Sequence, residues 1–299
     1  MLALRADDNS ALDGFVYYHY SPSLAAAILF AILFGLSTSL HSIQMLRSRT
    51  WFLIPFVIGG ILETIGYVGR ALSAGQNPGP YTLGPYIIQS LLTLVAPALF
   101  AASIYMELGR IVLMIDGEKA LFIRRTWMTK IFVSGDVLSF LLQAGGGGLM
   151  GTHRVATINL GQHIVVAGLF VQVIFFGLFV ITAALFHLRM TRMPTGRSYE
   201  LAWWKRHMMS LYVVSILIFI RSIVRVVEYL QGFNGYVMGH EAFIYVFDGL
   251  MMFTAVVVMN WIHPGEVARE LWAQRSRRAS HGSQESRDKD GMRMNPMSV

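Results

Sequence analysis

The sequence predicts an all-α membrane protein, a bundle of seven transmembrane helices with its N-terminus outside and its C-terminus in the cytoplasm. Hydrophobic residues make up 55% of the 299 residues and charged residues only 14%, whereas a soluble domain carries about 25% charged residues. The mean hydropathy is +0.53, and the apolar residues gather in long runs. One membrane domain therefore uses nearly the whole chain.

The expected spans follow from length, because a helix that crosses a bilayer needs about 20 mostly apolar residues. Ser21 and Pro22 predict the start of the first span, since Ser is a good N-cap and Pro suits the first helical position. Asn-Pro-Gly-Pro at 77–80 predicts a turn between two spans, and Pro264 predicts the end of the last one. The seven stretches run over 22–46, 51–73, 85–113, 128–150, 161–188, 207–230 and 241–262.

The membrane domain is expected at 21–264, after an extracytoplasmic segment at 1–20 and before a basic cytoplasmic tail at 265–299. The tail is rich in Ser, Arg, Asp and Gly, so we expect disorder, with Ser280 as a candidate kinase site. The first 15 residues carry charges and have no apolar core, which argues against a cleaved signal peptide. Because the chain has no cysteine, it has no disulfide, thiolate metal site or cysteine nucleophile.

The orientation follows from the basic residues of the loops. With the N-terminus outside, 18 of the 24 Lys and Arg residues fall in cytoplasmic segments, and only Arg5 and Arg154 fall outside. The positive-inside rule favours this topology. The basic loops and tail are expected to contact the anionic cytoplasmic leaflet, and this explanation of the positive charge is preferred to nucleic-acid binding.

Charged residues inside the spans are the most informative feature, because a charge at mid-bilayer costs about 2.5–3.5 kcal/mol on insertion scales and usually marks function. Four spans carry polar groups at helical spacing, which places each set on one helix face. The four stripes are Glu63, Tyr67 and Arg70; Asp136, Ser139 and Gln143; Arg221, Arg225 and Glu228; and Glu241, Tyr245 and Asp248.

These stripes predict a substrate-binding or translocation site in a polar cavity that opens to the outer leaflet. Most of the charges fall in the outer half of the bundle, and Glu63 and Asp136 fall nearer the middle. These two carboxyl groups are candidates for binding a head group or a proton, and the arginines would keep the carboxylates ionised or bind phosphate. The alternative is that the stripes are structural ion pairs that hold the helices together.

Glycines at 145–148 and at Gly151 end the fourth span. Gly147 and Gly151 form a GxxxG pair, which is typical of close helix packing. Unwinding that exposes backbone carbonyls to a cavity is the alternative.

Several function classes lack their motifs. The third span ends in Glu-Leu-Gly-Arg at 107–110 and the seventh in Asn-Trp-Ile-His-Pro at 260–264, so the usual signatures of G-protein-coupled receptors are missing. The spans contain no lysine for a retinal Schiff base, and the chain has no Walker motif. The histidines lie away from most carboxylates, and no metal or other cofactor is expected.

The ordered motifs resemble the fungal RTA-like family, also called the lipid-translocating exporter family, from about Tyr20 to Gly265. One departure is Val224, where the family pattern has an aromatic residue. The motifs are Glu63-x-x-Gly66-Tyr67-x-x-Arg70, Ala96-Pro97 with Leu108-Gly109-Arg110, Asp136-x-x-Ser139-x-x-x-Gln143, Arg221-x-x-x-Arg225-x-x-Glu228, and Glu241-x-x-x-Tyr245-x-x-Asp248 with His263-Pro264-Gly265.

The resemblance implies a non-enzymatic fungal protein, often at the plasma membrane, whose partners are membrane lipids or amphipathic small molecules. It implies export or translocation of sphingoid bases, sterol-like amines or toxic amphipaths, with effects on lipid asymmetry and resistance. Two alternatives stay open, a heptahelical sensor of membrane lipid state and an intramembrane metal-dependent lipid hydrolase. The sequence does not predict an oligomeric state.

Overall fold

The computed structural model describes residues 20–76, 81–150, 155–231, 235–237 and 239–293, which are helical apart from short connections. The expected turn at 77–80 lies outside these residues. The long helices are α2 (Leu24–Ser48), α3 (Ile54–Ala74), α4 (Leu83–Met114), α5 (Arg125–Met150), α6 (Val155–Arg192), α8 (Trp204–Gln231), α10 (Met251–Trp261) and α11 (Gly265–Arg293). Short helices connect them: η1 (Trp51–Leu53), η2 (Glu118–Ala120), α7 (Gly196–Glu200), α9 (Glu241–Phe243) and the π-helical segment η3 (Ile244–Leu250).

The start of α2 corrects one prediction. Ser23, and not Ser21, is the N-cap, and its hydroxyl accepts a hydrogen bond from the Ala26 amide. Pro22 consequently precedes the helix. The cap is held in place because the Ser23 amide itself donates to a carboxylate oxygen of Glu241 at 2.7 Å.

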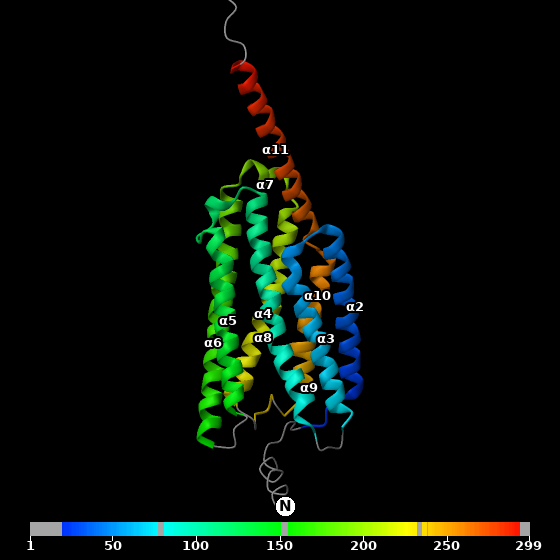
Figure 1. Cartoon of the computed structure of the whole chain (residues 1–299). Helices are drawn as coiled ribbons and strands as arrows, with labels where there is room; N and C mark the ends of the chain where they lie inside the picture. The colour runs from blue at the N-terminus through cyan, green and yellow to red at the C-terminus, as the bar shows by residue number, and fades with distance from the viewer. Residues whose placement is uncertain (1–19, 77–80, 151–154, 232–234, 238, 294–299) are drawn as a thin grey trace, which may run out of the picture.

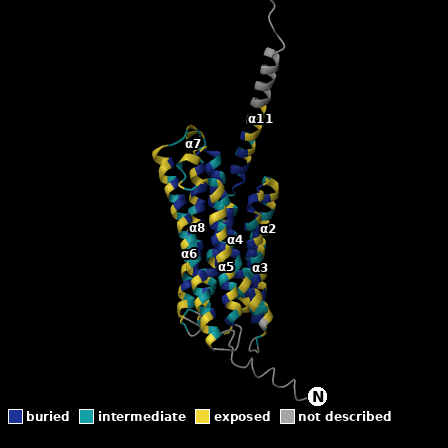
Figure 2. Ribbon diagram, turned by 60° about the vertical axis from the view of Figure 1, so that its left-hand side comes forward, coloured by how far each residue is buried: buried dark blue, intermediate teal, exposed yellow. Residues whose placement is uncertain are grey.

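The helices contact one another in a closed ring in the order α2, α3, α4, α5, α6, α8 and α10, with α10 returning to α2. They run side by side along the bundle (Figure 1). Helix α4 also contacts α8 across the bundle. Buried aromatic residues fill the interior, among them Phe34, Phe100, Tyr105, Phe132 and Phe179. Exposed residues, yellow in Figure 2, run along the flanks of the bundle. Many of the exposed residues are Leu, Ile and Val, an arrangement that suits a lipid solvent.

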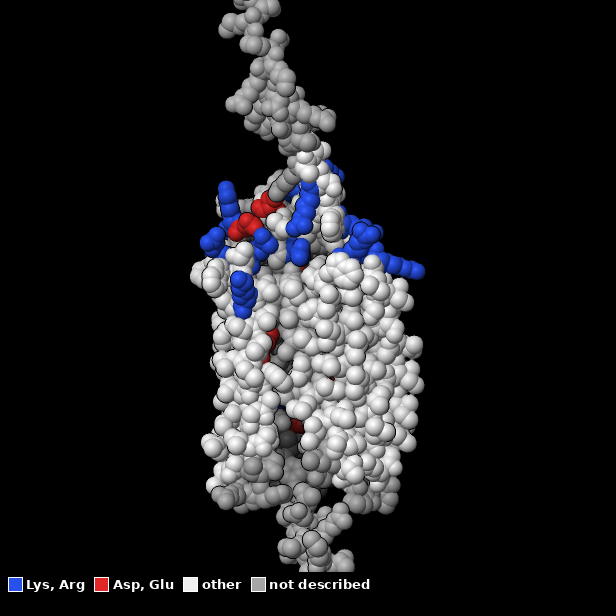
Figure 3. All heavy atoms as spheres, viewed as in Figure 1, with Lys and Arg blue, Asp and Glu red and all other residues white. Residues whose placement is uncertain are grey.

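Six helices in the described part are long and apolar enough to cross a membrane. They correspond to every predicted span except the fourth, so the all-α membrane prediction is confirmed in this coarser form. The fourth predicted span is α5, whose 26 residues extend about 39 Å. Its hydropathy is lowered by Asp136, Gln143 and the four glycines at 145–148. The blue Lys and Arg side chains gather at the end of the bundle where α7 and α11 lie (Figure 3), which is called the basic end below.

The first part of the tail packs on the bundle, and the disorder expected of the tail stays a prediction. Residues Gly265–Arg293 form α11, and the buried residues of its first three turns recur at helical spacing. Val267, Ala268 and Leu271 are buried, and the Gln274 side chain donates a 3.0 Å hydrogen bond to the Met114 carbonyl at the end of α4. These apolar contacts anchor the helix, although its overall composition is polar.

Close packing of α5 on α6 is confirmed, but through glycines other than the predicted pair. A Cβ atom on Gly146 would lie 2.6 Å from the Gly161 carbonyl oxygen, and a Cβ on Gly161 would lie equally close to the Gly146 carbonyl. Gly147 faces open space, and Gly151 lies outside the described residues. Only glycine permits this approach of the two backbones.

Candidate functional site

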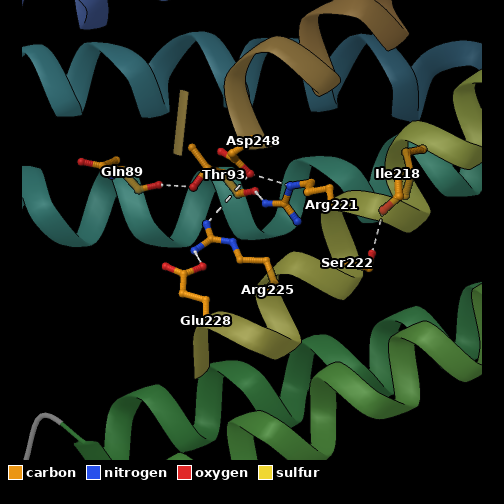
Figure 4. A network of polar contacts seen from close by, with 8 residues as sticks. All are labelled: Gln89, Thr93, Ile218, Arg221, Ser222, Arg225, Glu228 and Asp248. Carbon is orange, nitrogen blue, oxygen red and sulfur yellow. Dashed lines mark hydrogen bonds and ion pairs between the residues drawn. The ribbon is translucent and has the colours of Figure 1, made fainter. Parts of the chain in front are cut away.

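One polar network joins α8 to η3 and α4 (Figure 4). It lies in the half of α8 that is farther from α7 and the basic end. Arg221 Nε lies 2.5 Å from Asp248 Oδ1, and Arg221 Nη2 donates to the Thr93 carbonyl at 2.6 Å. Arg225 pairs with Glu228 at 3.0 Å and lies 4.0 Å from Asp248. These five residues are called the Arg221 cluster.

Glu63 on α3 lies beside this cluster and is fully buried. Its charge lies within electrostatic range of Asp248, Arg221 and Arg225, yet neither carboxylate oxygen accepts a hydrogen bond from any described residue. One turn further along α3, the buried Tyr67 ring stacks on Phe30, with ring centroids 5.3 Å apart. Glu63 is therefore a buried carboxyl group with unused hydrogen-bonding capacity.

A second network surrounds Arg70 and is called the Arg70 cluster. Arg70 Nη2 lies 2.7 Å from Glu241 Oε1, and Arg70 Nε donates to the Tyr245 hydroxyl at 2.9 Å. The Tyr20 hydroxyl accepts a further bond from Arg70 at 3.1 Å, and Tyr245 donates to the Ser23 carbonyl at 3.2 Å. The cluster thus ties the start of α2 to α3 and α9.

The predicted stripe of the seventh span is divided between the two clusters. Glu241 and Tyr245 meet Arg70 on α3, whereas Asp248 meets Arg221 on α8. Tyr245 and Asp248 both lie in the π-helical segment η3, whose i→i+5 hydrogen bonds change the helical phase. A 3.6-residue period would have left all three groups on one face.

The stripe on α5 is not joined to either cluster by any hydrogen bond or ion pair among the described residues. Asp136 lies beside the Tyr105 hydroxyl of α4, in the aromatic interior of the bundle. Ser139 donates to the Gly168 carbonyl at 2.7 Å, and Gln143 donates to Ser139 at 2.6 Å and to Gln172 at 3.2 Å. Ser139 and Gln143 thus hold α5 against α6. For these two residues the contacts are of the kind expected if the stripe holds helices together and does not bind a ligand.

The chemistry of the two clusters, taken with Glu63, is that of a charged site with an acidic excess. Three arginines face four carboxyl groups: Arg70, Arg221 and Arg225 against Glu63, Glu228, Glu241 and Asp248. Figure 3 shows a crevice in the apolar flank of the bundle in which acidic atoms are visible. In the described part of the chain, no group of three or more His, Asp or Glu side chains is arranged to hold a metal ion.

Two buried ionisable residues escaped the sequence-based prediction. Glu107 on α4 and His207 on α8 are both fully buried near the basic end, with Glu107 Oε1 3.9 Å from His207 Nδ1. Neither belongs to a predicted stripe, because the charged residues nearest to them along the chain, Arg110 and Arg206, lie near the ends of the spans. The sequence contained one signal for this pair, because Glu107 is a carboxylate about two turns inside an apolar span, where a charged residue usually marks function.

Comparison with known proteins identifies the family. The chain matches the family described as "RTA1 like protein" over residues 56–270. No solved structure matches the chain. Three curated relatives come from Saccharomyces cerevisiae. Protoporphyrin uptake protein 1 is 40% identical over 282 residues, covering 83% of this chain and 91% of the relative.

Protein RTA1 is 40% identical over 273 residues, covering 83% of this chain and 84% of the relative. Sphingoid long-chain base transporter RSB1 is 27% identical over 299 residues, covering 88% of this chain and 76% of the relative. The resemblance drawn from the stripes is therefore confirmed, and the chain belongs to the family of RTA1-like proteins.

Proposed function

We propose that this protein is a seven-span translocator that exports lipids or amphipathic compounds, with sphingoid long-chain bases and other amphipathic amines as the substrate class. In this proposal α5 completes the seven spans, the N-terminus lies outside, and the basic end faces the cytoplasm of a fungal plasma membrane. The protein acts without catalysis and contributes to lipid asymmetry and to resistance against toxic amphipaths.

The observation that carries the proposal is Glu63, a buried carboxyl group without a hydrogen-bond donor among the described residues, beside the Arg221 cluster. A charged group in a membrane domain is costly unless it is paired. An amine head group would supply the missing positive charge and N–H donors, while the apolar chain of the ligand would rest on the helix faces. The two clusters balance three arginines with three carboxylates, so Glu63 is the carboxyl group in excess, and this supports a cationic ligand.

The names of the relatives support amphipathic substrates whose head groups are positively charged in one case and negatively charged in another. One relative is named for sphingoid long-chain bases, which are amines, and another for protoporphyrin, which carries two carboxylates. The three arginines could meet a carboxylate, but each already contacts an acidic side chain. The acidic excess favours the amine for this chain.

The test measures release of a labelled sphingoid base from fungal cells that lack the protein and express the wild type or a variant at equal surface level. The variants are Glu63→Gln, Asp136→Asn and Arg225→Gln, and the control is Glu118→Gln, which breaks an exposed ion pair on a connection. We expect the wild type and control to raise release and Glu63→Gln to abolish the increase. Equal release with and without the wild-type protein would refute export of this substrate class.

The topology has its own test, because the chain contains no cysteine. A membrane-impermeant maleimide applied to intact spheroplasts should label Tyr236→Cys and should label Met193→Cys only after permeabilisation. Both positions are exposed, at 65% and 82%. The reverse labelling pattern would refute the proposed orientation. Labelling of both cysteine variants in intact spheroplasts would refute an odd number of spans between positions 193 and 236.

A sensor of membrane lipid state is the second candidate, favoured by the docking of α11 on the bundle. Glu266 and Gln274 connect α11 to α8 and α4, so a movement of those helices would reach the tail. Truncation after residue 276 retains the docked turns and removes the rest of α11. A translocator should keep its flux in this variant, whereas a sensor should lose its cellular output.

A further inference from the structure

A chain of ionisable side chains leads from the bundle interior to the aqueous phase at the basic end, remote from the stripes. It begins at Glu107 on α4, whose side chain is 0% exposed. Neither of its oxygens accepts a hydrogen bond from a described residue. Burial of an ionised, unpaired carboxylate is expensive, so this carboxyl group needs a partner or a proton.

His207 on α8 lies next to Glu107 and is equally buried. Its Nδ1 atom is 3.9 Å from Glu107 Oε1 and has no hydrogen-bond partner among the described residues. Its Nε2 atom is 3.3 Å from Glu266 Oε2. If Nε2 carries the proton and donates it to Glu266, the lone pair of Nδ1 faces Glu107, ready to accept a proton.

Glu266, in the first turn of α11, forms the outlet. Its side chain is 40% exposed, and Arg206 Nη2 lies 2.5 Å from the same Oε2 atom. The α11 helix therefore supplies the group that connects the buried histidine to water. Without the docked first turn of α11, His207 would lose its contact on the Nε2 side.

The other ionisable groups nearby do not interrupt this chain. Arg206 faces Glu266, and His263 lies within electrostatic range of His207, His41 and Arg269. His41 is bonded to Asn260 at 2.8 Å. Among the charged groups of the described residues, Glu107 has only His207 within ion-pair distance.

We propose that Glu107, His207 and Glu266 form a proton relay between the bundle interior and the aqueous phase at the basic end. The O–H bond of a protonated Glu107 breaks and an N–H bond forms at His207 Nδ1, which gives a carboxylate and an imidazolium. The Nε2 proton then passes to the Glu266 carboxylate and on to water. One proton leaves Glu107, and the neutral imidazole is left with its proton on Nδ1 until the reverse transfer or a ring rotation resets it.

The relay is tested on the purified full-length protein in nanodiscs, without any transported substrate. A rapid pH jump is applied, and the infrared C=O stretch of protonated carboxyl groups is followed in time. Glu107→Gln should remove one titrating band. His207→Gln should retain that band but slow its response at least about tenfold, since a positioned base accelerates proton transfer by about 10²–10⁴-fold.

Two further variants keep the test decisive. Glu266→Gln should also slow the Glu107 band, whereas His187→Gln, which alters a histidine bonded to Tyr212 at 3.2 Å and not to a carboxylate, should leave it unchanged. An unchanged set of bands in Glu107→Gln, or an unchanged rate in both His207→Gln and Glu266→Gln, would overturn the proposal. Since no substrate is used, failure of the relay is distinct from failure of lipid export.

Discussion

Removal of one member of the Arg221–Asp248 pair is expected to destabilise the protein more than removal of both. The two atoms in contact are 2.5 Å apart, and the side chains are only 2% and 5% exposed. With an effective dielectric constant of about 20, the gross attraction is about 7 kcal/mol, an upper limit. Desolvation of the two charges offsets most of it, while a single deletion leaves a buried unpaired charge and costs about 3–5 kcal/mol.

The two single variants should differ in a direction set by the structure. Asp248→Leu removes the ion-pair partner of Arg221 and leaves the Thr93 carbonyl as its hydrogen-bond acceptor among the described residues, so its cost should lie near about 5 kcal/mol. Arg221→Met leaves Asp248 with Arg225 at 4.0 Å, so its cost should lie near about 3 kcal/mol. The double variant replaces the pair with apolar side chains and should lie within about 1 kcal/mol of the wild type.

The assay is reversible unfolding of the purified protein in mixed micelles, followed by the loss of helical circular dichroism. Arg125→Met is the matched control, because it breaks an ion pair with Glu118 whose side chains are 34% and 56% exposed. That control should lose less than about 1 kcal/mol. Additive losses in the double variant, or single losses no larger than that of the control, would refute the reasoning.

Two further predictions concern α5 and α11. Gly146→Leu should lower stability by about 1–3 kcal/mol, because the added side chain meets the Gly161 carbonyl at the helix contact. Gly147→Ala, in open space, should be neutral or slightly stabilising, and equal unfolding midpoints of the two variants would contradict this. Partial burial raises the pKa of Glu266, but hydrogen bonds from Arg206 and His207 outweigh it and hold that pKa below its ordinary 4.5. The contribution of Glu266 to the docking of α11 is therefore complete above about pH 4.5 and is lost as the pH falls through the lowered pKa. Hydrogen exchange of α11 should show this loss in the wild type and not in Glu266→Gln. Identical acid profiles of the two proteins would disprove it.

The positions of the spans could be predicted because hydropathy over about 20 residues is a strong signal. Their ends could not, since polar residues continue a helix beyond the bilayer. Helix α6 runs over Val155–Arg192, whereas the apolar stretch predicted a shorter span over 161–188. The start of α2 depends on the bond between the Ser23 amide and Glu241, 218 residues away, which no local pattern contains.

The candidate site was predictable where it depends on helical spacing within one element. Arg225 and Glu228 pair at i, i+3 as the spacing suggests. Asp248 was expected to share a face with Glu241 and Tyr245, but the π-helical segment directs it to Arg221. Such a change of phase arises from tertiary packing, and a period count cannot reveal it.

The contacts of α4 with α8 connect the Arg221 cluster with the Glu107–His207 pair. Glu107 lies fourteen positions after Thr93 on α4, and Arg221 lies fourteen positions after His207 on α8. Each spacing corresponds to about 21 Å of helix. The two helices thus meet at Thr93–Arg221 and again at Glu107–His207. A displacement of α8 along α4 would change both contacts together, so a ligand that moves Arg221 would also change the distance over which Glu107 passes its proton.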